Sequence, residues 1–295
     1  MTIKGEGNNT KKNSIKQIRK DKKAVSPALS TMIITGAVIS MILVTVVYSN
    51  NFLNARLAEN EFSSIKQFLS TTGLQIDDIA WTIGRTQTVH YSSRFGNMAF
   101  QNETLNYTFE ARVGSNWKTL ATVETGIIMF NVPASTFSMG NNYFDRISPS
   151  LNGAFLQRGS TAPVAHVFAL EKLPMAEGNY TRIVVAPTIR MLNSTIAGPQ
   201  QGATRYYKFY LPTLETGNHL YRSQSISMTG NEITKISESG VNEVKISVTF
   251  PNGDEFTGFN SDFFKFDNDS EEVTLPGNSV VELYIGSVIV TLGKV

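Results

Sequence analysis

The sequence predicts an α+β fold, in which a long N-terminal hydrophobic helix precedes an antiparallel β-sandwich or barrel-like head. Two observations carry this prediction. No charged residue occurs between Lys23 and Arg56, and most of that run is apolar. After Gly84 the apolar residues change from helical spacing to alternation, which is the pattern of half-buried strands. We therefore expect three parts: a leader at 1–23, a helix at 24–84 and a β-rich head at 85–295.

The leader differs from the rest of the chain in charge. Residues 1–23 contain 8 of the 26 Lys and Arg but only 2 of the 24 Asp and Glu, so their formal charge is +6 and that of the remainder is −4. A segment this polar cannot form a core, which favours a disordered cytoplasmic tail. The head has no basic cluster, and we therefore expect no nucleic-acid partner.

Residues 24–48 are long enough to cross a membrane. As a helix rising about 1.5 Å per residue, they would span roughly 37 Å, more than the ~30 Å of a hydrocarbon core. The positive leader then predicts a single pass with the N-terminus inside and the C-terminus outside. The alternative is a cleaved secretory signal, which has a shorter apolar region of about 7–15 residues and a small-residue cleavage site. Neither feature is found up to Ala58.

A short motif joins the leader to the apolar run, and it consists of Lys22, Lys23, Ala24, Val25, Ser26 and Pro27. Ser is a good helix N-cap, and Pro fits the first helical position, where its missing N–H costs nothing. The motif and the run after it resemble the class III signal peptide of archaeal type IV pilin-like proteins, within the archaellin and pilin superfamily. The resemblance covers about 25 residues. It implies cleavage between Lys23 and Ala24 by a prepilin peptidase, with the helix retained on the mature protein.

Two departures from related families refine this resemblance. Bacterial type IV pilins carry Glu early in the mature helix, where this chain has Ala28. Archaellins usually have Gly at the cleavage site and lack the A-V-S-P sequence. The resemblance therefore favours an adhesive or minor pilin over an archaellum subunit.

An amphipathic pattern continues the helix beyond the membrane run, over 53–83. Apolar residues and one Thr recur at alternating spacings of four and three, which predicts one buried helical face: Ala58, Phe62, Ile65, Leu69, Thr72, Ile76, Ile79 and Ile83. A continuous helix over 24–83 would measure about 90 Å, longer than a simple anchor needs. The alternative is an anchor followed by a separate amphipathic helix that covers a sheet.

The head consists of short segments that read as strands. We expect these at 86–92, 105–113, 118–124, 126–132, 164–170, 180–192 with an interruption at Pro187, 206–211, 225–228, 232–236, 243–250 and 280–292. Turns or loops are expected at 134–158, 193–204, 230–231, 238–242 and 251–254. The pattern leaves open whether the head is one domain or two subdomains divided within 193–225.

Residues able to support catalysis or metal binding are sparse. The chain has no cysteine, which excludes disulfides, thiolate zinc sites and cysteine nucleophiles. His90, His166 and His219 lack metal-ligand spacing. Residues 267–272 have acidic groups at alternate positions, but Glu272 stands where a calcium loop needs Gly and Asn278 where it needs Glu. We therefore expect no enzyme, no catalytic or metal site and no cofactor, and we interpret 267–272 as a solvated acidic turn.

Glycosylation sequons are more frequent. N-x-S/T triplets occur in the head at Asn102, Asn106, Asn179, Asn193 and Asn268. A further triplet at Asn8 lies in the leader, on the side expected to be cytoplasmic. In an outward-facing head these sites could carry N-glycans, although a domain rich in Asn, Ser and Thr also generates such triplets by chance.

The sequence thus leads to two functional hypotheses. The first is a structural subunit, major or minor, of an archaeal type IV pilus-like surface filament. It would assemble through its helix, expose its head for adhesion, and have the membrane, the prepilin peptidase, other pilin subunits and an assembly platform as partners. The second is a permanently anchored extracellular β-sandwich binding protein. A surface hydrolase has no residues to support it.

Overall fold

The computed structural model describes residues 26–197, 203–219, 223–253 and 257–293. It divides between Arg56 and Leu57 into two compact units, which we describe in turn. Helix α2 (Ser26–Ala80) begins in the first unit and ends in the second. The other elements all belong to the second unit: β1 (Thr86–His90), β2 (Asn97–Val113), β3 (Asn116–Pro133), β4 (Tyr143–Ser148), β5 (Leu156–Arg158), β6 (Ala165–Glu171), β7 (Tyr180–Pro187), β8 (Ile189–Ala197), β9 (Ala203–His219), β10 (Ser225–Thr249), α3 (Ser261–Phe264) and β11 (Ser270–Gly293).

The strands of the second unit form one mostly antiparallel sheet, so the α+β prediction is confirmed. Its order is β4-β6-β7-β3-β2-β10-β11-β9-β8-β5, and β1 pairs with β10 beside this path. Two of its pairs, β9 with β11 and β5 with β8, are parallel, which the expectation of an antiparallel head did not include. For the first pair, β10 supplies the return run that parallel neighbours need. The whole sheet falls within one unit, and residues 193–225 do not divide it.

Several expected loops and turns are wrong, because their residues pair as strands. The segment 134–158 contains β4 and β5, and the described parts of 193–204 belong to β8 and β9. The expected turns at 230–231 and 238–242 lie inside β10, where the register shifts without ending the pairing. Gly and Asn occur at β-bulges inside strands as well as in turns. Here the pairing of β10 with β11 continues past these residues, so they form irregularities within the strand.

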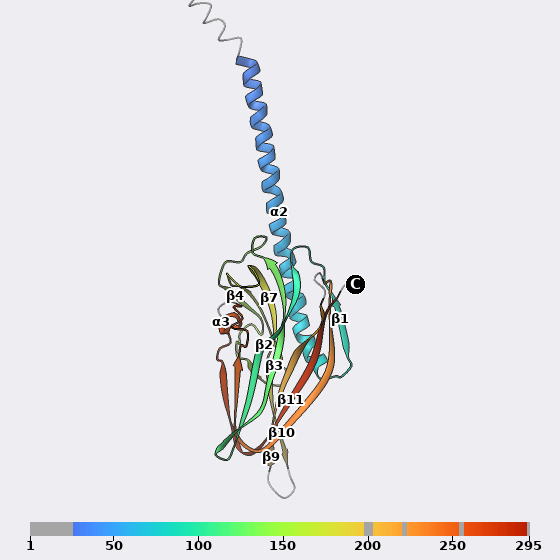
Figure 1. Cartoon of the computed structure of the whole chain (residues 1–295), viewed down its shortest axis with the longest axis vertical. Coiled ribbons are helices and arrows are strands. Elements are labelled where there is room, and N and C mark those ends of the chain that lie inside the picture. The colour runs from blue at the N-terminus through green and yellow to red at the C-terminus, as the bar shows by residue number, and fades with distance from the viewer. Residues whose placement is uncertain (1–25, 198–202, 220–222, 254–256, 294–295) are drawn as a thin grey trace, which may run out of the picture. The chain divides into compact units, whose positions relative to one another are not determined.

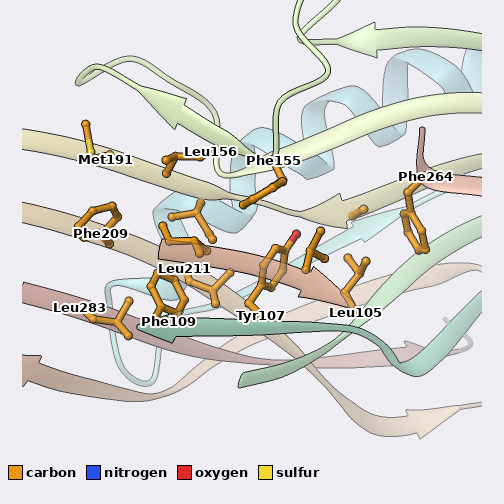
Figure 2. Close-up of a cluster of buried hydrophobic side chains, with 14 of the residues drawn as sticks. Leu105, Tyr107, Phe109, Phe155, Leu156, Met191, Phe209, Leu211, Phe264 and Leu283 are labelled. Carbon is orange, nitrogen blue, oxygen red and sulfur yellow. The ribbon is translucent and has the colours of Figure 1, made fainter. Parts of the chain in front are cut away.

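One face of the sheet encloses the larger hydrophobic core. Figure 2 shows side chains from β2, β8, β9, β11 and α3 converging in this core. Tyr107 is fully buried there, and its hydroxyl donates to the Pro187 carbonyl at 2.8 Å, so its polar atom has a partner. Phe109 and Phe209 meet edge to face, with ring centroids 6.2 Å apart.

The other face of the sheet packs against residues 57–80 of α2 (Figure 1). In β3, Ile127 and Met129 enter the first core and Ile128 and Phe130 the second, which explains why this strand is apolar without alternation. The predicted helical face is confirmed, since these residues are at most 3% exposed: Ala58, Phe62, Ile65, Leu69, Thr72, Ile76 and Ile79. Ile83 is the exception, 65% exposed, because the helix ends at Ala80.

Three glycines bring the helix close to the sheet. A Cβ on Gly73 would lie 2.9 Å from the Val167 side chain. A Cβ on Gly230 would lie 2.5 Å from the carbonyl oxygen of Thr82, and one on Gly286 would lie 2.5 Å from that of Ala80. Gly230 thus gives close approach to the end of the helix, where its sequence context had suggested a turn.

Candidate functional site

The candidate functional element of the first unit is the apolar part of α2. Every large apolar side chain between Leu29 and Leu53 is 48–75% exposed among the described residues. Consecutive positions such as 41–44 point in all directions around a helix, so no single face can account for this exposure. A helix that is apolar all round is stable inside a membrane or among other apolar helices.

Two hydroxyl groups of this segment are bonded within the helix itself. Ser40 Oγ donates to the Gly36 carbonyl at 2.8 Å, and Thr45 Oγ1 donates to the Met41 carbonyl at 2.7 Å. Such bonds satisfy a hydroxyl without water. Within the described residues, α2 is the one helix long and apolar enough to cross a membrane. The length and composition of this helix agree with the predicted membrane-spanning segment, and the orientation is untested.

The processing motif lies at the edge of the described chain. Lys22, Lys23, Ala24 and Val25 fall outside the described residues, whereas Ser26 and Pro27 lie in the first turn of α2. Pro at the start of a helix is compatible with helical geometry. Cleavage between Lys23 and Ala24 therefore remains a prediction.

Two helix carboxylates join α2 to the rest of the second unit, Glu61 to the connection between β1 and β2 and Asp77 to β8, and neither was singled out from the sequence. Glu61 accepts hydrogen bonds from Ser93 Oγ at 2.6 Å and from the backbone N–H of Arg94 at 2.8 Å. Asp77 accepts two from Arg190, at 2.6 and 2.9 Å, and one from Trp81 Nε1 at 2.8 Å. Apart from Trp81, their partners lie more than 30 positions along the chain, so helical periodicity gave no signal for them.

The three histidines lie on different strands. His90 is exposed on β1, and His219 on β9 contacts Thr216 Oγ1 at 2.8 Å. His166 on β6 is 6% exposed and lies 3.1 Å from Gln157 Nε2; burial, with a smaller contribution from Arg146, lowers its pKa to about 4. Among the described residues, no group of three or more His, Asp or Glu could hold a metal ion.

The acidic turn has a structural contact that the sequence did not reveal. Residues 267–270 are exposed, but Asp267 also accepts a hydrogen bond from the Gly153 N–H at 3.1 Å and contacts Arg146 at 3.3 Å. Burial raises the pKa of Glu271, and the charge of Arg158 opposes this shift. The turn thus joins the start of β11 to the chain before β5.

The sequons differ in accessibility. Four of their asparagines are exposed: Asn102, Asn179, Asn193 and Asn268. Asn102 lies where the register of β2 and β3 shifts between Gln101 and Leu105. Asn106 is half-buried within β2, and its Oδ1 is buried without a partner among the described residues. Four sites are therefore open to modification on the folded chain, and glycan occupancy itself remains a prediction.

A small cavity lies between the start of β4, the end of β6 and α3. It has a volume of about 180 Å³ and is lined by Asn142, Tyr143, Phe144, Lys172, Asp262 and Lys265, among others. The sequence gave no signal for it, because three of its eight lining residues come from a segment expected to be a loop. We refer to it below as the β4–α3 cavity.

Comparison of the chain with models of known protein families, with curated proteins and with solved structures finds no match.

Proposed function

We propose that the protein is a subunit of a type IV pilus-like surface filament and assembles through the apolar part of α2. In this proposal the leader is cytoplasmic, the segment 24–48 spans the membrane, and the β-rich second unit faces outward. The protein acts as a structural subunit and not as an enzyme.

The exposed apolar surface of α2 is the observation that carries this proposal. The uncharged run continues from Leu29 to Ala55, about 40 Å as a helix, whereas a hydrocarbon core needs roughly 30 Å. Residues 57–80 of the same helix pack on the sheet. One helix therefore supplies both an apolar segment for association and a packing face for its own head.

The assembly mechanism would be physical. A prepilin peptidase removes the basic leader at Lys23, which frees the helix from its charged tether. The helix then leaves the bilayer for neighbouring helices that are equally apolar. Lipid and helix surfaces are similarly apolar, so the transfer depends on side-chain packing and not on a hydrophobic gain.

The N-terminus of the protein extracted from membranes tests this proposal. We expect peptide mass spectrometry to find a mature chain that begins at Ala24. Lys23→Asp should block processing, and Lys16→Gln, which leaves the motif intact, should not. An intact Met1 in the wild-type protein would instead favour the permanently anchored binding protein.

The filament itself requires a second measurement. Fibres sheared from the cell surface should contain the processed chain, and the Lys23→Asp variant should be absent from them. A processed chain that never enters fibres would contradict the assembly role, even if cleavage at Ala24 occurs.

A further inference from the structure

The β4–α3 cavity is formed by three separate segments of the chain. Asn142, Tyr143 and Phe144 come from the start of β4, Lys172 follows β6, and Lys265 follows α3. Asn142, Asp262 and Lys265 are exposed, so the cavity opens to solvent. Lys172 Nζ donates to Asn260 Oδ1 at 2.8 Å, and Lys265 Nζ lies 5.0 Å from the centre of the Phe144 ring.

The two lysines of this cavity differ from the other lysines described in the second unit. Five of those lysines have a carboxylate oxygen within 2.6–3.8 Å, and they are Lys66, Lys118, Lys208, Lys235 and Lys245. Lys172 and Lys265 have no such ion pair among the described residues. Among the described lysines of the unit, the two without a carboxylate partner thus both line this cavity.

The two carboxylates of the lining, Glu171 and Asp262, form no ion pair with these lysines. Burial would raise the pKa of Glu171, but hydrogen bonds from Ser138, Thr181 and the Met139 N–H outweigh it and hold the pKa below its usual value. Its oxygens are therefore already occupied. Asp262 is exposed and forms no ion pair with either lysine, so it remains an open hydrogen-bond acceptor.

The size and polarity of the cavity restrict its ligand. Its volume of about 180 Å³ is below the roughly 300–1,000 Å³ of sites for drug-sized ligands, so it admits one small ring. Two ammonium groups suit a carboxylate, whereas the Asp262 carboxylate and the Asn142 amide suit hydroxyl groups. Phe144 is stacked against Phe168 at 5.3 Å, so its ring is not a free platform for stacking.

We propose that the β4–α3 cavity binds an acidic sugar residue, with its carboxylate at Lys172 and Lys265 and its hydroxyl groups at Asp262 and Asn142. Such residues occur in polysaccharides, and the open side of the cavity would let one residue of a polymer enter. The proposal adds a ligand class to the exposed head of the proposed function. Binding at this cavity does not depend on filament assembly.

A ligand-observed NMR titration of the full chain in detergent micelles tests the assignment, with glucuronate as the probe and glucose as its neutral counterpart. We expect saturable binding of glucuronate and much weaker binding of glucose. Lys172→Gln and Lys265→Gln should each weaken glucuronate binding by about tenfold or more, because each removes a charge-assisted hydrogen bond. Lys245→Gln, which removes a partly exposed, ion-paired lysine elsewhere on the sheet, should have no effect.

Asp262→Asn separates a sugar site from a simple anion site. If the carboxylate of Asp262 accepts sugar hydroxyls, the variant should bind glucuronate more weakly, whereas a site for anions alone would bind them more tightly once the negative charge is removed. Glucuronate binding that is equal in the wild type and both lysine variants would overturn the proposal. So would acetate binding as tight as that of glucuronate. These results would leave the assembly role to the N-terminal and fibre experiments.

Discussion

Asp77 connects three parts of the second unit through a single carboxylate. Its oxygens accept hydrogen bonds from Arg190 on β8 and from Trp81 just beyond the helix. The Arg190 guanidinium lies 5.3 Å from the Tyr210 ring, which stacks on Tyr284 with centroids 5.0 Å apart. The two tyrosine rings therefore contact other groups of the protein. We interpret the chain of contacts from Asp77 through Arg190 to these rings as a structural support for the end of α2.

Removing this carboxylate should destabilise the second unit. Arg190 has 11% of its side chain exposed, so Asp77→Ala leaves a largely buried cation without its partner. We expect a loss of about 2 kcal/mol in the free energy of unfolding, measured by urea denaturation. Asp78→Ala is the matched control, because its pair with Arg85 is exposed and should contribute less than about 1 kcal/mol. Equal effects of the two variants would contradict the role given to Asp77.

His166 should make the stability of the fold depend on pH. Its pKa is lowered to about 4 in the folded chain, mainly by burial, and is near 6.5 when unfolded. Between these values the unfolded state binds the proton more readily, so stability is complete above about pH 6.5 and falls towards pH 4. The loss from His166 alone should be about 2 kcal/mol between roughly pH 7 and pH 5.

A comparison of variants isolates this contribution. His166→Gln should show a smaller loss of unfolding free energy on acidification than the wild type. His90→Gln, at an exposed position on β1, should retain the wild-type dependence. A wild-type slope in His166→Gln would show that other groups cause the acid sensitivity.

At the scale of elements, the close packing of the end of α2 on the sheet restricts which residues each of them can carry. The helix presents one apolar face, and β10 and β11 present glycines where its last carbonyl groups approach. Gly230 also exchanges backbone hydrogen bonds with the chain beyond the helix, at 2.8 Å to the Gly84 N–H and 2.9 Å to the Arg85 carbonyl. A strand position next to a helix terminus thus requires glycine for space and not for a turn.

Gly286→Ala should loosen this contact. The added Cβ would lie 2.5 Å from the backbone oxygen of Ala80, which cannot move as a flexible side chain can. We expect a destabilisation of about 1–3 kcal/mol and a lower melting temperature. Gly277→Ala in the same strand is the control, because the nearest atom to its Cβ is 4.0 Å away and no strain should result. An unchanged melting temperature in Gly286→Ala would contradict the close approach.

At the scale of the whole molecule, the two units differ in how they satisfy their apolar side chains. The second unit buries them in two cores on opposite faces of one sheet. The described part of the first unit, from residue 26 onward, leaves its large apolar side chains exposed. The two units thus present opposite surfaces, and the proposed assembly role places the apolar one among lipid or neighbouring helices.

Truncation of the chain should separate the exposed apolar surface of the first unit from the buried cores of the second. A chain that begins at Leu57 keeps both cores, and we expect it to be soluble without detergent and to elute as a monomer in size-exclusion chromatography. A chain that begins at Gly84 lacks the helix face and exposes the second core, including Phe130, Val185 and Val288, and we expect it to aggregate. A soluble, folded chain from Gly84 would show that the helix is dispensable for the head.

Local pattern in the sequence determined the helix, its buried face and the α+β class. A run without charge and apolar residues spaced alternately four and three apart both lie within one helix. They therefore predict which of its faces are apolar without any information about distant residues. The same holds for the interruption at Pro187, where β7 ends and β8 begins two residues later.

Only the tertiary structure decided the features that depend on residues far apart in the chain. Strand pairing turned expected turns at 230–231 and 238–242 into bulges, made β9 and β11 parallel, and brought Arg190 to Asp77. It also gathered Lys172 and Lys265 at one cavity from two segments 93 positions apart in the numbering. The physical reason is that the register of strand pairing decides which residues of a sheet are neighbours. That register depends on partner strands that lie far away in the sequence.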